Sequence, residues 1–511
     1  MVLPKKRWLW TFTKMLSVCC LVTSIFNTAP IREGVADETV DIGSQRELFI
    51  DNHVIDVIEG DARLELQQPE PQQLAVVTDK PWEGNTCAYY TVFADTNAEG
   101  EPVFRMYYRG SKYDLDTRKQ VHRQVTCYAE SQDGIHWTKP NLGLYEFDGS
   151  KENNIVFDGA GTGSFTPFKD ANPNCPPEEL YKALGQVHRD GTPYYAAQGE
   201  MTVFSYKSPD GIHWTISDGP LITRGDFDSQ NSAFWDPYAG LYREFHRVRF
   251  YQPPEGDLII GGFAARPGYR SIMTGTASKN FLNWTSWTKP ELLKFDDDIG
   301  PQQLYTNAVR NCPRAPHILI GFPTRLLPEE NNRVEPIFMS SRDGQTFRRW
   351  AKPVISEEAP EDRSGNRSNY MAWGLLTLPG NDREYSVYAS ENYLSRTPTR
   401  LRRFTFRADG FVALRGGKEG GQLTTKPLNV GGGKLEINYL ARPGGQVRVE
   451  IQDVHGQPLA NFSADDCDPL QGDEIAQQIS WRGDANGPFT GRPVRVRFEV
   501  KDADVYSFRF P

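Results

Sequence analysis

The sequence predicts an all-β fold, a five-bladed β-propeller followed by a C-terminal β-sandwich, from three observations. A short tract of the type Ser-x-Asp-Gly-x-x-aromatic recurs at Ser131–Trp137, Ser208–Trp214, Ser341–Phe347 and, in a weaker copy, Ser278–Trp284. Short alternating strands and turn residues run from about residue 47 to the end of the chain, whereas helical periodicity is scarce. The 511 residues, with 45 Gly and 36 Pro, are enough for two domains.

The recurring tract is predicted to be a turn between two strands. Its glycine takes a positive φ, its aspartate caps the turn, and its serine adds a bond from side chain to backbone. The aromatic residue that ends it is a large apolar anchor. The tract resembles a shortened Asp-box of the sialidase type, which sits between outer strands of propeller blades. We therefore expect a structural role for the tract and for its histidines, His136 and His213.

Five repeating units are predicted ahead of residue 411. In three of them an aspartate stands between the first two expected strands, at Asp95, Asp170 and Asp236. Because these aspartates occupy equivalent turns, we expect them to be structural residues. Four strands in each of five units predict a five-bladed propeller over residues 47–411, and the run Leu48–Asp51 is expected to supply a strand that closes the ring.

Residues 412–511 have a different composition, in which a glycine-rich segment precedes strands with alternating apolar and polar residues. This alternation is typical of half-buried strands and predicts a small β-sandwich. The expected strands are Lys434–Tyr439, Gln446–Ile451, Val494–Val500 and Val505–Phe510.

The N-terminal 36 residues are predicted to be a signal peptide. Lys5, Lys6 and Arg7 precede the apolar stretch Met15–Phe26, which is too short to span a bilayer comfortably. We therefore expect a secreted or periplasmic protein with no membrane contact after cleavage. An uncleaved membrane anchor is the alternative.

Charge and cysteine content exclude several classes of function. The net charge is −9 with both signs mixed along the chain, so no nucleic-acid partner is expected. Cys87, Cys127, Cys175, Cys312 and Cys467 would remain after cleavage; their odd number and lack of CxxC spacing predict mostly buried free thiols. No cofactor is expected, and although a Ca²⁺ ion in the propeller channel is compatible with the fold, no motif indicates one.

The strands nearest the channel of a propeller begin at the ligand funnel, so residues just before them are the best site candidates. Three carboxylates from three units, Glu83, Asp228 and Glu391, are predicted to be catalytic, because glycosidic cleavage needs one carboxyl acid and a second carboxylate as base or nucleophile. Aromatic, amide and guanidinium side chains at the same ends are predicted to bind substrate: Trp82, Asn85, Arg109, Asn231, Arg247, Tyr305, Arg325 and Trp373. An alternative is that the arginines pair with those carboxylates and stiffen the funnel.

A signal segment, five four-stranded blades and a trailing sandwich together resemble the five-bladed glycoside hydrolases. The organisation looks most like the family 32 invertase-type enzymes, and next most like the family 43 arabinanases and xylosidases. Pro81–Asn85 stands near the place of the invertase-type nucleophile motif, and Lys169–Asp170 resembles its Arg-Asp-Pro element. The Glu-Cys acid motif of those enzymes has no counterpart in this sequence.

The function predicted from the sequence is that of an exported glycoside hydrolase acting on a poly- or oligosaccharide, including anionic ones, through paired carboxylates. Two alternatives remain open at this point. One is a non-catalytic carbohydrate-binding propeller of the cell surface, and the other is a sialidase-like enzyme. The sequence indicates neither the sugar, the linkage nor the oligomeric state.

Overall fold

In the computed structural model, the chain from residue 39 onward forms β-strands, with short 3-10 helices at η1 (Pro177–Glu179) and η4 (Pro328–Glu330). The predicted all-β class is therefore confirmed. The structure describes residues 39–97, 100–188, 201–251, 259–260, 269–277, 280–282, 284, 291–356, 369–482, 489 and 491–511. The predicted signal peptide, residues 1–36, lies outside the described residues. Within the described ranges, no helix is long and apolar enough to cross a bilayer.

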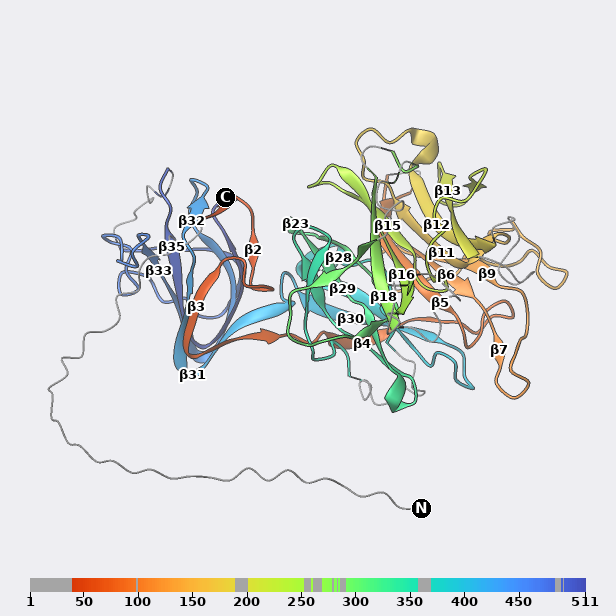
Figure 1. The fold of residues 1–511 in the computed structure, drawn as a ribbon. Helices are drawn as coiled ribbons and strands as arrows, with labels where there is room; N and C mark the ends of the chain where they lie inside the picture. The colour runs from red at the N-terminus through yellow and green to blue at the C-terminus, as the bar shows by residue number, and fades with distance from the viewer. Residues whose placement is uncertain are drawn as a thin grey trace, which may run out of the picture. The chain divides into compact units, whose positions relative to one another are not determined.

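Five sheets, each built on four antiparallel strands, follow one another along the described chain (Figure 1), and we call them meanders 1 to 5. Meanders 1 and 2 contain β5 (Ala88–Thr96), β6 (Pro102–Gly110), β9 (Val125–Ser131) and β10 (Ile155–Phe157), then β11 (Gly161–Lys169), β12 (Tyr181–His188), β13 (Met201–Ser208) and β14 (Thr215–Ile216). Meander 3 contains β15 (Ser232–Asp236), β16 (Leu241–Tyr251), β18 (Tyr269–Ala277) and β19 (Glu291–Leu292). Meanders 4 and 5 contain β22 (Arg310–Cys312), β23 (Ala315–Gly321), β26 (Met339–Ser341) and β27 (Thr346–Arg349), then β28 (Leu376–Leu378), β29 (Asn381–Glu391), β30 (Arg400–Arg407) and β4 (Glu70–Val77).

The fourth strand of meander 5 comes from the N-terminal part of the chain, but not from the predicted segment. β4 pairs with β30, whereas β2 (Glu47–Leu48) pairs with β35 (Arg495–Arg509) near the C-terminus. The expectation for Leu48–Asp51 is therefore wrong. Leu48, Phe49 and Ile50 are all fully buried, which suits a segment packed on both sides, while β4 is mostly exposed or half-buried, with Val76 alone buried. Such exposure suits a strand at the edge of a sheet.

The repeated tracts form the corners between the third and fourth strands of their meanders. In the first copy, Asp133 Oδ1 accepts the backbone N–H groups of the two residues after Gly134, both at 2.8 Å, and Ser131 Oγ accepts the N–H of Gly134 at 2.9 Å. The copies built on Asp210 and Asp343 repeat this pattern. Gly134 has φ 70°, which a glycine adopts without steric cost. The predicted structural role of the tract is confirmed.

Replacement of Asp210 by alanine is expected to lower the free energy of unfolding by about 1 to 2 kcal/mol, because two backbone N–H groups lose their acceptor. Burial opposes the charge of Asp210, but bonds from His213 and from the Ile212 N–H lower its pKa to about 2. The stabilisation is thus complete above the ordinary aspartate pKa of about 3.9 and is lost as the pH falls toward about 2. Denaturant unfolding at neutral and acidic pH measures both effects. The matched control is Asp218→Ala, and equal midpoints for Asp210→Ala and wild type at neutral pH would contradict the role of the corner.

Contacts join each meander to the next and the fifth to the first. Most of them run between an arginine or aromatic side chain and a neighbouring corner or strand. In chain order they are Tyr107 hydroxyl to Gly211 O at 2.9 Å, the Phe168 and Phe281 rings at 5.6 Å, Arg243 Nη1 to Asp343 O at 3.0 Å, Arg310 Nη1 to Leu375 O at 3.0 Å, and Tyr388 hydroxyl to Gly134 O. The five meanders therefore contact one another in a cyclic order.

The equivalent aspartates contribute to this cyclic arrangement. Each stands at the end of the first strand of its meander, pairs with a cation of that meander and accepts a hydrogen bond from the next one. The pairs are Asp95 with Arg105 at 2.5 Å and Tyr181 at 2.6 Å, Asp170 with Lys182 and Tyr242 both at 2.6 Å, and Asp236 with Arg243 at 2.6 Å and Asn311 at 3.0 Å. The structural role predicted from their equivalent positions is confirmed.

The C-terminal part forms a six-stranded sheet that also includes two strands from the N-terminal part, β2 and β3. Two pairs of predicted strands are each continuous, in β33 and β35, because register shifts such as the one between Ala441 and Gln446 absorb the intervening residues without ending the strand. The main strands are β3 (Ile55–Leu66), β31 (Val412–Thr425), β35 (Arg495–Arg509), β33 (Glu436–Gln452) and β34 (Asp473–Gln478). Close by, β1 (Val40–Gly43) pairs in parallel with β32 (Leu428–Val430).

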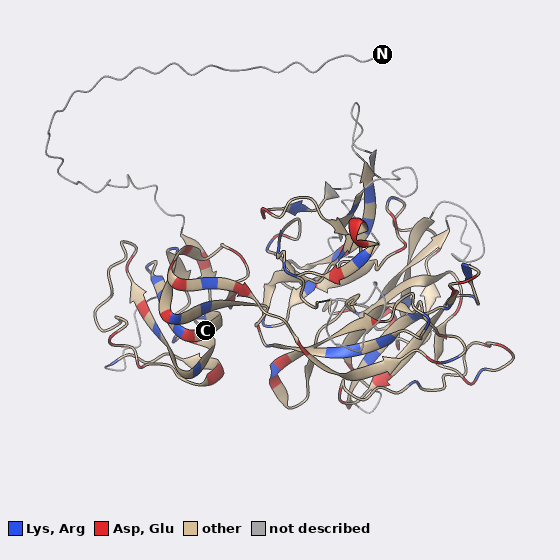
Figure 2. Ribbon diagram, turned by 90° about the horizontal axis from the view of Figure 1, so that it is seen from below, with Lys and Arg blue, Asp and Glu red and all other residues tan. Residues whose placement is uncertain are grey.

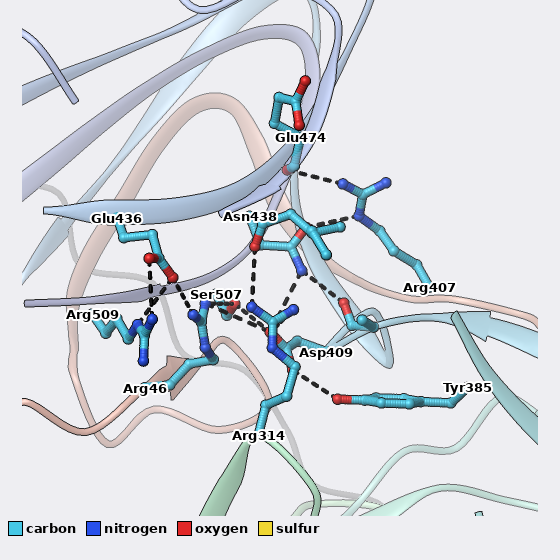
Figure 3. A network of polar contacts seen from close by, with 12 residues as sticks. Arg46, Arg314, Tyr385, Arg407, Asp409, Glu436, Asn438, Glu474, Ser507 and Arg509 are labelled. Atoms are coloured by element: carbon cyan, nitrogen blue, oxygen red, sulfur yellow. Dashed lines mark hydrogen bonds and ion pairs between the residues drawn. The ribbon is translucent and has the colours of Figure 1, made fainter. Parts of the chain in front are cut away.

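A buried carboxylate lies where β30 leads into β31. Asp409 is fully buried and has φ 60°. Its carboxylate accepts the Tyr385 hydroxyl at 3.1 Å and the Ser507 hydroxyl at 2.7 Å, and it lies near two guanidinium groups (Figure 3). These belong to Arg314, at 3.3 Å, and Arg46, at 3.7 Å. One side chain thus connects meanders 4 and 5 with the C-terminal sheet.

Charged residues and cysteines follow the sequence expectations. Figure 2 shows positive and negative residues interspersed over the ribbon rather than segregated by sign.

All five cysteines from Cys87 to Cys467 are free thiols, and Cys175 alone among these five is not fully buried. The prediction of mostly buried free thiols is confirmed.

Candidate functional site

Glu83 is enclosed by protein and fully paired. Its side chain has no exposed surface. Oε1 accepts the Tyr108 hydroxyl at 2.5 Å, and Oε2 contacts Lys139 Nζ at 2.7 Å and the Lys80 N–H at 3.0 Å. These partners tie the loop ahead of β5 to the segment that follows the first corner. The structure thus gives Glu83 contacts that stabilise the fold.

Glu391 is also enclosed. It ends β29, its side chain has no exposed surface, and its two oxygens accept bonds from Arg400 Nε and Arg402 Nε, each at 2.7 Å. Both arginines lie on the adjacent strand β30. The structure therefore does not bring Glu83, Asp228 and Glu391 together around shared partners: Glu83 and Glu391 belong to separate buried ion pairs.

Asp228 is the predicted catalytic carboxylate that remains partly exposed. It lies in the segment that leads into β15. The Tyr89 hydroxyl donates to its Oδ1 at 3.2 Å, and in the described part of the chain no hydrogen bond occupies its Oδ2. One carboxylate oxygen is therefore oriented by the protein while the other is available to a ligand.

Tyr89 is held in an unusual backbone conformation. Its φ is 57°, in the left-handed region that a tyrosine rarely adopts, and it lies where the register of β5 against β6 shifts between Ala88 and Thr91. Burial, and then the charge of Asp228, raise the pKa of Tyr89 well above its ordinary value. The phenol therefore stays protonated and donates to Asp228. Backbone strain of this kind concentrates at functional sites.

Two arginines flank this pair. The guanidinium of Arg109 lies 4.7 Å from the centre of the Tyr89 ring, and its Nη2 donates to the Tyr393 hydroxyl at 3.2 Å. The guanidinium of Arg247 lies 4.5 Å from the centre of the Tyr305 ring. Both arginines are almost completely buried, and Asp228 is among the charges that act on each of them. The site is thus electropositive around one open carboxylate.

A small, partly open pocket adjoins these residues, with a volume of about 10 Å³, which is room for about one water molecule. Tyrosines dominate its walls, and their rings contact edge to face: Tyr305 with Tyr370 at 5.8 Å, and Tyr370 with Tyr393 at 5.3 Å. The lining residues are Ala88, Tyr89, Tyr90, Gln230, Tyr305, Thr306, Tyr370, Met371 and Tyr393. They come from the start of β5, from the segments before the first strands of meanders 3, 4 and 5, and from the residues just after β29. The strand ends singled out in the sequence therefore meet here.

The remaining predicted binding residues make contacts within the fold. Three of them donate to backbone or side-chain oxygens nearby: Trp82 Nε1 to Asn154, Asn85 Nδ2 to Ser395 O, and Trp373 Nε1 to Val309 O, at 2.7, 2.7 and 2.8 Å. Asn231 is fully buried and bonds to Ser164 at 3.0 Å, and Arg325 pairs with Glu335. Among the predicted binding residues, Tyr305 lines the pocket, and Arg109 and Arg247 lie over the rings of two tyrosines that line it.

Sequence reasoning missed Tyr89, Tyr370 and Tyr393, together with Arg249 and Arg270 beside Arg247. A signal for two of them was present, because Tyr89 and Tyr370 stand at the starts of repeating units. The arginines had no such signal, since Arg249 and Arg270 meet only through the pairing of β16 with β18.

Metal ligands do not cluster in the described part of the chain. There, no group of three or more His, Cys, Asp and Glu side chains is placed to hold a metal ion.

Comparison with known proteins gives structural similarities alone. No protein-family model matches the chain, and no curated protein matches it. Similar solved structures include an N-acetylgalactosamine deacetylase from F. plautii (TM-score 0.44; 12% identity; 68% of this chain and 96% of the other). Others are a glycosyl hydrolase from Bacteroides ovatus (TM-score 0.35; 12%; 73% and 97%) and a mannose phosphorylase from Leishmania mexicana (TM-score 0.38; 12%; 66% and 88%). These values assign the chain to none of those families.

Proposed function

We propose that this protein is an exported glycoside hydrolase that cleaves a poly- or oligosaccharide at the pocket beside Asp228. The observation that carries the proposal is the partly exposed Asp228 carboxylate, oriented by Tyr89 at the edge of a tyrosine-lined pocket. In this proposal the five meanders, between residues 70 and 407, are the blades of a five-bladed propeller, which corrects the predicted bounds of 47–411. Residues 412–511 form a β-sandwich together with β2 and β3, and residues 1–36 are a cleaved signal peptide. The cyclic contacts between meanders support the propeller.

Asp228 would act as the general acid. Glycosidic cleavage needs a carboxylic acid that protonates the leaving oxygen, and the open Oδ2 is the atom that can do so. The Tyr89 hydroxyl would fix the carboxylate in one orientation. Tyr305, Tyr370 and Tyr393 offer ring faces and edges to the apolar faces of sugar rings. Each group thus has a role at one sugar linkage.

Asp226 is the second carboxylate of the proposed pair. Asp226, two residues before Asp228, is held by Arg247 at 3.0 Å and by Arg249 at 2.5 Å. Burial opposes its charge, but these two arginines lower its pKa, so it stays ionised. Glycosidic cleavage pairs the acid with a second carboxylate, which acts as base or nucleophile. We therefore include Asp226 as the ionised partner of Asp228.

One observation favours a second candidate, a sialidase-like enzyme. Such an enzyme requires a tyrosine paired with a carboxylate and arginines that bind an acidic sugar, and the Tyr89–Asp228 pair lies near Arg109 and Arg247. A third candidate, a carbohydrate-binding propeller without catalysis, is favoured by the burial of Glu83 and Glu391 in ion pairs.

A glycan screen tests the proposal and separates the three candidates. Purified protein is incubated with neutral, uronic-acid-containing, sulfated and sialylated glycans, and both released reducing ends and melting temperature are measured. Release of reducing ends from a neutral or anionic polysaccharide is the expected result. Release of sialic acid alone would support the sialidase-like candidate. A rise in melting temperature without cleavage of any glycan would support the binding protein, since a ligand that binds the folded state stabilises it.

A further inference from the structure

Three arginines lie on one face of meander 3 beside the pocket. Arg247 and Arg249 are two residues apart on β16, so their side chains point to the same face, and Arg270 of β18 stands directly opposite Arg249. Like charges directly opposite each other on neighbouring strands destabilise a sheet. Charge repulsion within the cluster Arg247–Arg249–Arg270 therefore destabilises the sheet locally, and some other interaction must offset it.

The described residues offset it only in part. Asp226 pairs with Arg247 and Arg249, so one carboxylate faces two cations. Arg270 donates to the neutral side chain of Gln303 at 3.2 Å. Burial, and then the charges of Arg249 and Arg247, lower the pKa of Arg270 to about 10. The cluster thus carries more positive than negative charge.

Hydrogen-bond donors in the cluster are also unused. Arg247 is 2% exposed, and its Nη1 has no hydrogen-bond partner in the described part of the chain. The same is true of Arg270 Nε. An unpaired buried N–H group is destabilising, so these donors point to a missing acceptor.

The cluster adjoins the pocket through one aromatic ring. The guanidinium groups of Arg247 and Arg270 lie 4.5 and 5.3 Å from the centre of the Tyr305 ring, and Tyr305 lines the pocket. Ser229 Oγ donates to Tyr305 O at 2.6 Å, which ties this ring to the segment that carries Asp228. The side chain of Tyr305 therefore contacts the cluster and also lines the pocket.

We propose that Arg247, Arg249 and Arg270 form a subsite for an anionic oxygen-bearing group, a sulfate ester or carboxylate carried by the sugar substrate. Guanidinium groups bind such anions through paired N–H donors. The anion would accept the unused donors and offset the repulsion between Arg249 and Arg270. The sugar part of this inference rests on the proposed function, whereas the anion part does not.

The test compares the wild type with Arg270→Gln in buffers of equal ionic strength. Binding of inorganic sulfate, of a neutral oligosaccharide and of its sulfated and uronic-acid counterparts is measured by calorimetry and by melting temperature. We expect the charged oligosaccharides to bind the wild type at least about tenfold more tightly than the neutral one, and Arg270→Gln to abolish this preference. Arg270→Lys keeps the charge and should retain most of it. The matched control is Arg396→Gln, which removes an arginine that is 74% exposed.

A readout without ligand separates this role from a structural one. Because Arg270→Gln relieves repulsion, its melting temperature in chloride buffer should equal or exceed that of the wild type. A lower melting temperature, or an unchanged preference for charged oligosaccharides, would overturn the subsite. Sulfate binding that Arg270→Gln abolishes, with equal affinity for charged and neutral oligosaccharides, would identify a free anion as the ligand and overturn the sugar part. A protein that binds charged oligosaccharides and cleaves none would leave the subsite standing and contradict the proposed hydrolysis.

Discussion

Replacement of Asp228 by asparagine is expected to lower the rate of glycan cleavage by about 100- to 10,000-fold, the usual contribution of a general acid. Asparagine has nearly the same shape and can still accept the Tyr89 hydroxyl, but it cannot protonate a leaving oxygen. The melting temperature should therefore change little. The measurement is kcat/KM on the glycan identified by the screen, with binding of the same glycan followed by calorimetry. Binding should persist while turnover is lost.

Glu83→Gln and Glu391→Gln are the comparison variants. Each removes a buried carboxylate that faces one or two cations, so each should lower the unfolding midpoint, because a buried cation left unpaired is strongly destabilising. Their folded molecules should cleave at close to the wild-type rate. A wild-type rate for Asp228→Asn, together with a large loss of rate in folded Glu83→Gln, would return the catalytic role to Glu83 and refute the assignment to Asp228.

The sequence was most informative where a local pattern determines its own structure. The bonds of each corner join residues no more than three positions apart, such as Asp133 with the N–H of His136, so their geometry follows from the tract itself. The turn roles of Asp95, Asp170 and Asp236 could be predicted from repetition, although their partners in the next meander could not. Local chemistry thus predicted the turns, and repetition predicted the order of the units.

The candidate site was predicted in part. The rule that ligand residues stand at the strand ends nearest the funnel selected Tyr305, which lines the pocket. It also selected Asp228, Arg109 and Arg247, which contact tyrosines that line it. The same rule selected Glu83, whose partner Lys139 lies 56 residues further along the chain. A strand end can be located from sequence, but the direction of its side chain and the identity of distant partners depend on packing.

The N-terminal segment shows the same limit. Leu48, Phe49 and Ile50 form a continuous apolar run, which suits a strand buried on both faces. The chain instead uses the more polar β4 to complete meander 5, because an outermost strand needs only one buried face. The partner of an apolar segment depends on the hydrophobic cores that it can pack against, which the local sequence does not reveal. Here the ring centres of Phe49 and Phe498, on β35, lie 5.6 Å apart.

Asp409→Asn is expected to lower the free energy of unfolding by about 3 to 5 kcal/mol, because it leaves buried cations without their carboxylate. Asparagine is chosen over alanine because the φ of 60° at this position suits Asn and would add strain to Ala. The measurement is denaturant unfolding, followed both by tryptophan fluorescence and by far-UV circular dichroism. Arg46 keeps a second partner in Glu436, so most of the loss should come from Arg314 and from the bonds to Tyr385 and Ser507.

The matched control, Asp473, is a surface residue that pairs with Arg407, one of the residues labelled in Figure 3. Asp473 is 44% exposed and pairs with Arg383 and Arg407, so Asp473→Asn should cost less than about 1 kcal/mol. Equal losses for the two variants would contradict a special role for Asp409. If Asp409 couples the C-terminal sheet to meanders 4 and 5, its removal should also separate the two spectroscopic transitions, since loss of coupling breaks two-state unfolding. Coincident transitions in Asp409→Asn would place the coupling in the other contacts between these sheets.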